Sequence, residues 1–319
     1  MNAQTQTAAV STFAPVAAPV FAADARGALI TVKNPGEALP PAFKLKAAQA
    51  RTQAIIRVGG GCKGFTKEAQ EGMLPYFIAA GRQTDANGKL QKELSCVVFS
   101  GGTVNRTADG TMLDDMVTSV PGVLAMHYPV IALSTTPRTD DLYAQRQFPG
   151  LSVGDQGLDL RAHGLVVVQE SAAVNAGAWD LDVPDYFTFM ESLVEQEWKA
   201  GMIFLNGGDI TRDEIYGALK RGFHVMVVEG SLRETDAFIK AYRDGDWSAT
   251  CAEFKAKQLG KGRDAAEVDA AVKKVHDACK EVLAGVKPNQ VSILPLNDAD
   301  ALRAVLIERG YLTDVVEAA

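Results

Sequence analysis

The residues best suited to chemistry in this chain lie in glycine-rich turns, each at the end of a short apolar run. Each run is rich in β-branched residues and has the length of a strand. Glycines between a strand and a helix leave backbone N–H groups open to a phosphate. The four runs are IIRVGGG at 55–61, CVVFSGGT at 96–103, MIFLNGGD at 202–209 and VMVVEGS at 225–231. We therefore predict an open parallel sheet with one crevice at its carboxyl edge, large enough for a polyphosphate.

The third turn offers the most complete set of groups for an anion. Gly207 and Gly208 leave room for a ligand against the backbone. Thr211 could cap the following helix and donate its hydroxyl to a phosphate, where the helix dipole also favours negative charge. Glu214 lies three residues later, in the capping-box position. It could complete that box, or it could contact a ligand or act in catalysis.

The second turn repeats this logic with a cation nearby. Gly101, Gly102 and Thr103 end the second run, and Arg106 follows three residues later. An arginine pairs well with phosphate oxygens, so Arg106 could neutralise the ligand. It could equally be a solvated loop residue.

The first and fourth turns would complete the crevice. Gly59, Gly60 and Gly61 could wrap a diphosphate, although the order of a Walker A loop is absent. The Rossmann fingerprint is not satisfied either, so conventional NAD binding is not predicted. The residues that could contact a ribose or base at the fourth turn are Glu229, Gly230, Ser231 and Asp236. Ser231 could instead be an ordinary helix cap.

The order of elements predicts a Rossmann-like, doubly wound α/β fold, because apolar strands alternate with helices of 10 to 15 residues. We expect one domain over 26–319, after a flexible arm over 1–25, with a helical insertion at about 246–288. The predicted strands are 28–33, 55–61, 97–100, 129–133, 165–168, 202–205, 225–228 and 291–296. The predicted helices are 67–82, 111–120, 186–199, 211–221, 233–243 and 299–309, with two more in 248–285 that separate near 261–263.

Composition narrows the classes of function. A net charge of −7 argues against a broad nucleic-acid surface. The four cysteines and four histidines are scattered, which predicts no disulfide framework, no metal site and a cytoplasmic location. No run reaches the apolar length of a membrane span. The first 25 residues have no Lys or Arg, so they lack the basic start of a signal peptide. We expect no resident cofactor, a small-molecule nucleotide partner and a homo-oligomer.

The turns together resemble the SLOG superfamily, most closely its prokaryotic branch similar to the cytosolic N-terminal region of TRPM channels. The resemblance covers roughly 50–310. It rests on RVGGG, FSGGT, LNGGDITRDE and VVEGSLRETD in that order, and on the closing ILPLNDADALRAVL. It implies a Rossmann-like fold that binds nucleotides or nucleotide-derived ligands, with ADP-ribose-type signals prominent.

A more distant resemblance joins the third turn to the LOG phosphoribohydrolases, whose motif is Pro-Gly-Gly-x-Gly-Thr-x-x-Glu. Here Gly207, Gly208, Thr211 and Glu214 match, whereas Asn206 replaces the proline and Ile210 the third glycine. Those enzymes also use an arginine from the preceding helix, and no arginine occurs between 161 and 212. One stabiliser of the glycosidic transition state is therefore missing.

Two functions follow. The first is binding or sensing of an ADP-ribose-like ligand or a cyclic relative. The second is hydrolysis of a nucleotide N-glycoside, in which Glu214 would stabilise the oxocarbenium ion and Arg106 would bind the phosphate.

Overall fold

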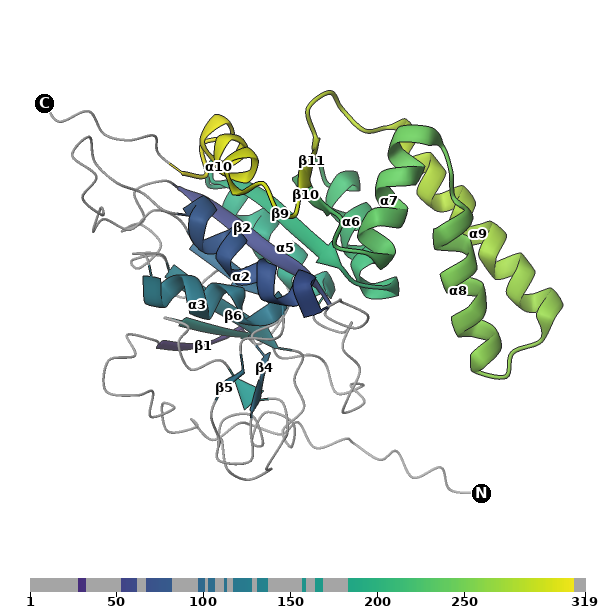
Figure 1. The fold of residues 1–319 in the computed structure, drawn as a ribbon, viewed down its shortest axis with the longest axis horizontal. Coiled ribbons are helices and arrows are strands. Elements are labelled where there is room, and N and C mark those ends of the chain that lie inside the picture. Colours follow the sequence, from purple (N-terminus) through teal and green to yellow (C-terminus); the bar gives the residue numbers. More distant parts are fainter. Residues whose placement is uncertain are drawn as a thin grey trace, which may run out of the picture.

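An eight-stranded parallel sheet organises the chain (Figure 1). The computed structural model describes residues 28–32, 53–61, 67–81, 97–100, 103–106, 112–113, 117–127, 131–136, 157–158, 164–168 and 183–312. In sheet order the strands are β1 (Ala28–Val32), β8 (Gly164–Val168), β6 (Ile131–Thr136), β3 (Val97–Ser100), β2 (Ala54–Gly61), β9 (Lys199–Asn206), β10 (His224–Glu229) and β11 (Val291–Pro295). The predicted doubly wound α/β fold is confirmed.

The strand order has a reversal at its centre. From β2 the chain runs outward through β3, β6 and β8, and then returns to place β9 on the other side of β2. From β9 it continues outward through β10 to β11. Six neighbouring strands of the sheet are β6, β3, β2, β9, β10 and β11. Numbered among themselves in chain order, they follow the 3-2-1-4-5-6 order of a dinucleotide-binding fold, and β8 and β1 extend the sheet beyond β6. The switch point, where such folds bind ligands, lies between the carboxyl ends of β2 and β9.

Helices bury both faces of the sheet, and the alternation of side chains along the strands explains why. Met202 and Phe204 of β9 pack in one core, whereas Ile203 and Leu205 pack in the other. The first core holds side chains from α5 (Val183–Val194), α6 (Asp209–Lys220), α7 (Arg233–Asp244) and α9 (Ala265–Ala284). The second holds side chains from α2 (Lys67–Gly81), α3 (Val120–His127) and α10 (Ala299–Glu308). A strand that is apolar on both faces is the expected signature of a parallel sheet.

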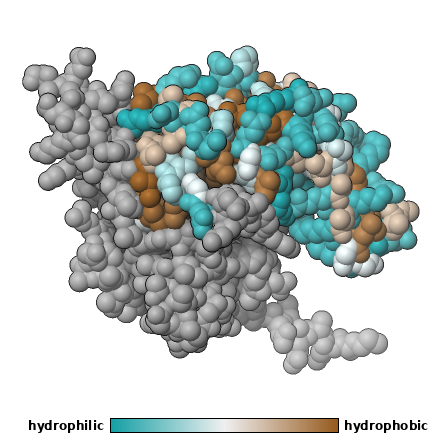
Figure 2. Space-filling model, viewed as in Figure 1, coloured by the Kyte–Doolittle hydropathy of each residue, from teal (hydrophilic) through white to brown (hydrophobic). Residues whose placement is uncertain are grey.

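The predicted insertion is a helical hairpin of α8 (Ser248–Gly260) and α9, which separate close to the predicted break. It follows α7 and extends away from the sheet (Figure 1). Figure 2 shows that the described residues on this face of the molecule are mainly hydrophilic, with smaller hydrophobic groups among them. In the described part of the chain, no helix is long and apolar enough to cross a bilayer.

The structure corrects one predicted helix. Residues 111–120 were expected to be helical, but they contain β5 (Met112–Leu113) and a 3-10 turn (Val117–Ser119), and α3 begins only at Val120. Strand β5 pairs with β4 (Thr103–Arg106), which also pairs with β7 (Gly157–Leu158) to form a small second sheet. A two-residue strand is too short for sequence periodicity to reveal.

The approach of β2 to β9 yields a stability prediction. Gly60 has a φ of +130°, and a Cβ there would overlap the carbonyl oxygen of Leu205. We expect Gly60→Ala to lower the free energy of unfolding by about 1–3 kcal/mol or more, measured by urea denaturation. The control is Gly72→Ala in α2, where a Cβ meets nothing within 4 Å. That helical change should stabilise by about 0.5–1 kcal/mol. Equal stability of the two variants would contradict the described approach of the strands.

Candidate functional site

Two of the four predicted turns lie side by side at the switch point. The register pairs Gly61 of β2 with Asn206 of β9, so residues 59–61 and 206–208 form one structure, here called the glycine corner. The Asn206 N–H donates to Ser231 Oγ at 2.9 Å, and its carbonyl accepts from Thr235 Oγ1 at 2.7 Å. These bonds join the glycine corner to the fourth turn at the end of β10.

The glycines of this corner differ in what surrounds them. A Cβ at Gly59 would lie 2.7 Å from the Phe204 ring, and one at Gly207 would overlap the Thr211 side chain. Gly59, Gly60 and Gly207 are therefore required by packing within the protein. At Gly61 a Cβ would meet only the Gly207 Cα, at 3.7 Å. Gly61 is the corner's glycine with the most open space, whereas a Cβ on Gly208 would meet the side chains of Arg233 at 2.9 Å and Glu253 at 3.5 Å.

The second predicted turn lies only partly within the described residues. Gly101 and Gly102 fall outside them. Thr103 and Arg106 are the first and last residues of β4, so a strand follows this turn instead of the expected helix. The side chain of Arg106 lies outside what the structure describes, so its predicted contact with a phosphate stays a prediction.

Helix α6 begins at the corner without a capping side chain. Its N-cap is Gly208, with φ −148°, and no side-chain hydrogen bond caps the helix. The prediction that Thr211 caps the helix is wrong, because the helix starts at Asp209 and Thr211 is buried in its first turn. An uncapped start leaves backbone N–H donors and the positive end of the dipole directed at the corner.

Glu214 does not form the capping box that its spacing suggested. Its Oε1 accepts hydrogen bonds from Arg57 Nη2 at 2.8 Å and Nε at 3.3 Å, and from the Tyr186 hydroxyl at 2.7 Å. The Arg57 guanidinium lies over the Tyr186 ring, 3.7 Å from its centroid. Glu214 is only 3% exposed. Arg57 of β2 and Glu214 of α6 thus form a buried ion pair, and Tyr186 of α5 donates a further hydrogen bond to the same carboxylate oxygen.

Sequence analysis missed Arg57 as the partner of Glu214. The signal was present, because Arg57 is a single charge inside an apolar strand, and buried charges require partners. The arginine expected from the helix before β9 is absent, and this one comes from β2 instead.

The residues of the fourth turn are engaged within the protein. Asp236 accepts from the backbone N–H of Gly230 at 2.9 Å and of Leu232 at 3.0 Å. Glu229 pairs with Arg243 on the surface. Ser231 donates to the Val228 carbonyl at 2.6 Å, and α7 has no side-chain cap, so Ser231 is not the cap that was considered. These groups shape the turn, and their predicted contacts with a ribose or base stay predictions.

Backbone strain gathers at the same edge. Asn206 has φ +54°, and the consecutive residues Leu232 and Arg233 have φ +73° and +54°. A non-glycine residue in this region costs on the order of 1–3 kcal/mol and persists where the surroundings impose it. Three such residues, at the end of β9 and the start of α7, make this edge a candidate functional site.

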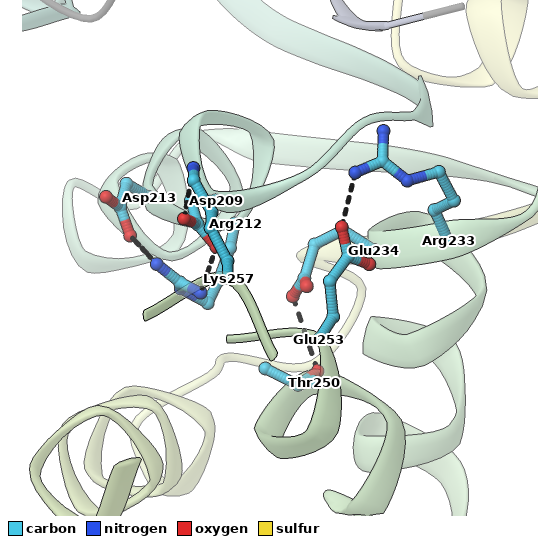
Figure 3. A network of polar contacts seen from close by, with 8 residues as sticks. All are labelled: Asp209, Arg212, Asp213, Arg233, Glu234, Thr250, Glu253 and Lys257. Carbon is cyan, nitrogen blue, oxygen red and sulfur yellow. Dashed lines mark hydrogen bonds and ion pairs between the residues drawn. The ribbon is translucent and has the colours of Figure 1, made fainter. Parts of the chain in front are cut away.

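A cluster of charged residues joins α8 to the starts of α6 and α7 (Figure 3). This charged cluster consists of Asp209, Arg212, Asp213, Arg233, Glu234, Thr250, Glu253 and Lys257. Arg212 donates to Asp209 and Asp213, both at 3.1 Å, and Lys257 also pairs with Asp209. Arg233 pairs with Glu253. None of these charged residues was selected from the sequence; Arg212 pairs within α6, but the pairs Lys257–Asp209 and Arg233–Glu253 join separate helices and leave no local pattern.

Glu234 is the buried acid of this cluster. It is 1% exposed, and the Thr250 hydroxyl lies 3.4 Å from its Oε1. Burial raises the pKa of Glu234 to about 8, and Glu253 and Asp209 add to the rise, against the lowering effect of Arg212. The side chain is therefore protonated at neutral pH.

The described residues contain no group of three His, Cys, Asp or Glu side chains that could hold a metal ion. Backbone donors and the arginines of the cluster are instead suited to an anion.

Comparisons with known proteins do not assign a family. No family model and no curated protein matches the chain. Among solved structures, one match is YcaC from Pseudomonas aeruginosa with hexane-2,5-diol and covalent acrylamide. It is 11% identical, covers 82% of this chain and 88% of its own, and has a TM-score of 0.26. A likeness of that size supports no argument about this site.

The buried ion pair yields a second stability prediction. Glu214→Gln removes the carboxylate charge that Arg57 contacts through Nη2 and Nε, so the free energy of unfolding should fall by about 3 kcal/mol or more. The double variant Arg57→Met with Glu214→Leu should recover most of that loss, since it removes both charges. Urea denaturation of the three proteins measures both effects. A Glu214→Gln protein as stable as the parent would contradict a structural role for the pair.

A third prediction concerns pH and Glu234. Its pKa is raised in the folded state, from 4.5 to about 8, so folding favours the protonated form. This contribution to stability is full below pH 4.5 and is lost as pH rises to about 8, on the order of a few kcal/mol. Glu234→Gln should lack it. Urea unfolding from pH 5 to 9 should show the parent losing stability relative to the variant, and parallel pH profiles would refute the assignment.

Proposed function

We propose that this protein binds a nucleotide-derived ligand, such as ADP-ribose or a cyclic relative, at the carboxyl edge between β2 and β9. One observation carries the proposal: the uncapped start of α6 lies beside Gly61 at the switch point of a sheet with dinucleotide-binding order. Free N–H groups and the helix dipole favour a phosphate there. Ligands of doubly wound folds bind at this point of the sheet.

The resemblance of the turns to the SLOG superfamily supports the choice of an ADP-ribose-type ligand. An ADP-ribose diphosphate would meet the α6 start, and its sugars and base would extend along the edge toward the β10 turn. Ser231 holds these two regions together by its bond to Asn206.

Binding is favoured over hydrolysis by the state of Glu214. An acid that stabilises an oxocarbenium ion must face the sugar. In this protein the Glu214 charge is already paired with Arg57, and Tyr186 also donates to Oε1, whereas Oε2 would lie 3.2 Å from a Cβ on Gly59 of the glycine corner. We therefore propose a sensor or carrier of the intact ligand.

The test is calorimetric titration with ADP-ribose, AMP and NAD, together with chromatography for released base. We expect ADP-ribose to bind and no base to be released. Gly208→Val should weaken binding at least tenfold, about 1.4 kcal/mol, because its side chain would occupy the corner. The variant should fold, since the φ of Gly208 is negative and the nearest atom to a Cβ, at 2.9 Å, is the flexible end of Arg233.

Gly72→Ala is the matched control, because it changes a glycine of α2 that has open space around it. Unchanged affinity in Gly208→Val would place the ligand elsewhere. Base release by the parent protein would support the hydrolase instead.

A further inference from the structure

Arg233 lies directly over the glycine corner. A Cβ on Gly208 would be 2.9 Å from Arg233 Nη2, which places the guanidinium at the start of α6. The positive φ angles of Leu232 and Arg233 set the backbone from which this side chain extends. A strained backbone that directs a cation to a helix N-terminus is a candidate for anion recognition.

An internal carboxylate already occupies the neighbourhood of this cation. Glu253 of α8 pairs with Arg233, and its Oε1 would be 3.5 Å from the same Cβ on Gly208 (Figure 3). A carboxylate is a reasonable chemical substitute for a phosphate oxygen, since both accept from a guanidinium and favour a helix N-terminus. Glu253 thus takes the position that a ligand phosphate would need.

A second donor at the corner has no partner. Asn206 is completely buried, and its Nδ2 makes no hydrogen bond. Its Oδ1 accepts from the Gly207 N–H at 2.5 Å, so the amide is folded back toward the start of α6. A buried donor without an acceptor costs on the order of 1–3 kcal/mol, and an anionic ligand would supply that acceptor.

Exposure decides which cation of the charged cluster an incoming anion can reach. The Arg212 side chain is 5% exposed and is held by both Asp209 and Asp213. The side chains of Arg233 and Glu253 are 28% and 31% exposed. A partly exposed pair contributes little, on the order of 0–1 kcal/mol, whereas breaking a buried pair costs several times more. Arg233 is therefore the cation that a ligand can capture.

We propose that Arg233 binds the phosphate of the ligand and that Glu253 of α8 competes with that phosphate as a built-in carboxylate. The inference rests on the proposed function, because it names the recognition residue of the same site. It makes the α8–α9 hairpin a determinant of affinity, since α8 brings the competing group to the corner. The chemistry that ADP-ribose shares with inorganic pyrophosphate is the diphosphate group.

The experiment titrates the full-length protein with inorganic pyrophosphate and separately with ADP-ribose, by calorimetry at pH 7 in phosphate-free buffer. Glu253→Gln should bind pyrophosphate roughly tenfold tighter than the parent, because it removes the negative charge that competes with the ligand for Arg233. Arg233→Gln should bind it at least roughly tenfold more weakly. Lys257→Gln is the matched control, because it breaks the other ion pair of α8 while Arg233 keeps Glu253. It should not tighten binding.

Each remaining outcome is decisive. Equal pyrophosphate affinity of the parent and Glu253→Gln, or no binding by either, overturns the inference. Tightening in Lys257→Gln as well would show that a loosened α8, and not the loss of the competing carboxylate, is responsible. Failure of ADP-ribose to bind, with the pyrophosphate pattern intact, would refute the proposed function alone. ADP-ribose binding without that pattern would refute only the role of the two residues.

Discussion

The Arg57–Glu214 ion pair, which joins β2 to α6 beside the pairing of β2 with β9, is the interaction on which the arrangement of this edge depends. These two strands begin the two halves of the sheet, and helices α5 and α6 supply Tyr186 and Glu214 to the same contact. Taking two charges from water is costly unless the geometry and the additional hydrogen bonds are good. Here Oε1 receives three donors, so the pair specifies one relation between strands and helices. The glycine corner lies next to this ion pair, since Glu214 Oε2 would be 3.2 Å from a Cβ on Gly59.

The carboxyl edge illustrates how packing and binding compete for the same residues. Three glycines that suggested a phosphate cradle are required because Phe204, Leu205 and Thr211 occupy the space beside them. Close packing of this kind limits where a ligand can enter. The start of α6 also has no side-chain cap and Asn206 has a strained backbone, and neither feature stabilises the packed protein. The uncapped start of α6 and the strained Asn206 are therefore the features that support a ligand site.

Sequence patterns predicted the parts of the fold that depend on local periodicity. The β10 strand, helix α7 and the break between α8 and α9 follow from apolar runs, polar faces and the Lys-Gly-Arg segment near 262. The start of α6 was misplaced because a threonine with the right spacing looked like a cap, while the chain enters the helix through an extended Gly208.

The candidate site was predictable only where a single turn provides it. Gly208 was selected because the turn itself shows the glycine. Arg57 and Glu214 are 157 positions apart, and no local pattern joins them. Arg233 was passed over in favour of Ser231 and Asp236, which have conventional turn chemistry. Its significance depends on Gly208 and Glu253, which lie on two other helices.

The charge balance of the cluster explains how an acidic protein can present an anion site. Three cations, Arg212, Arg233 and Lys257, face the carboxylates of Asp209, Asp213 and Glu253. A fourth ionised acid would give this edge a net negative charge and repel a phosphate. Burial prevents this, because the pKa of Glu234 near 8 keeps its proton at neutral pH. Covering Glu234 with α8 thus removes a repulsive charge, and the same helix supplies Glu253. In the proposed site the hairpin therefore acts on the edge in two opposing ways, and the affinity for a phosphate would depend on the difference between them.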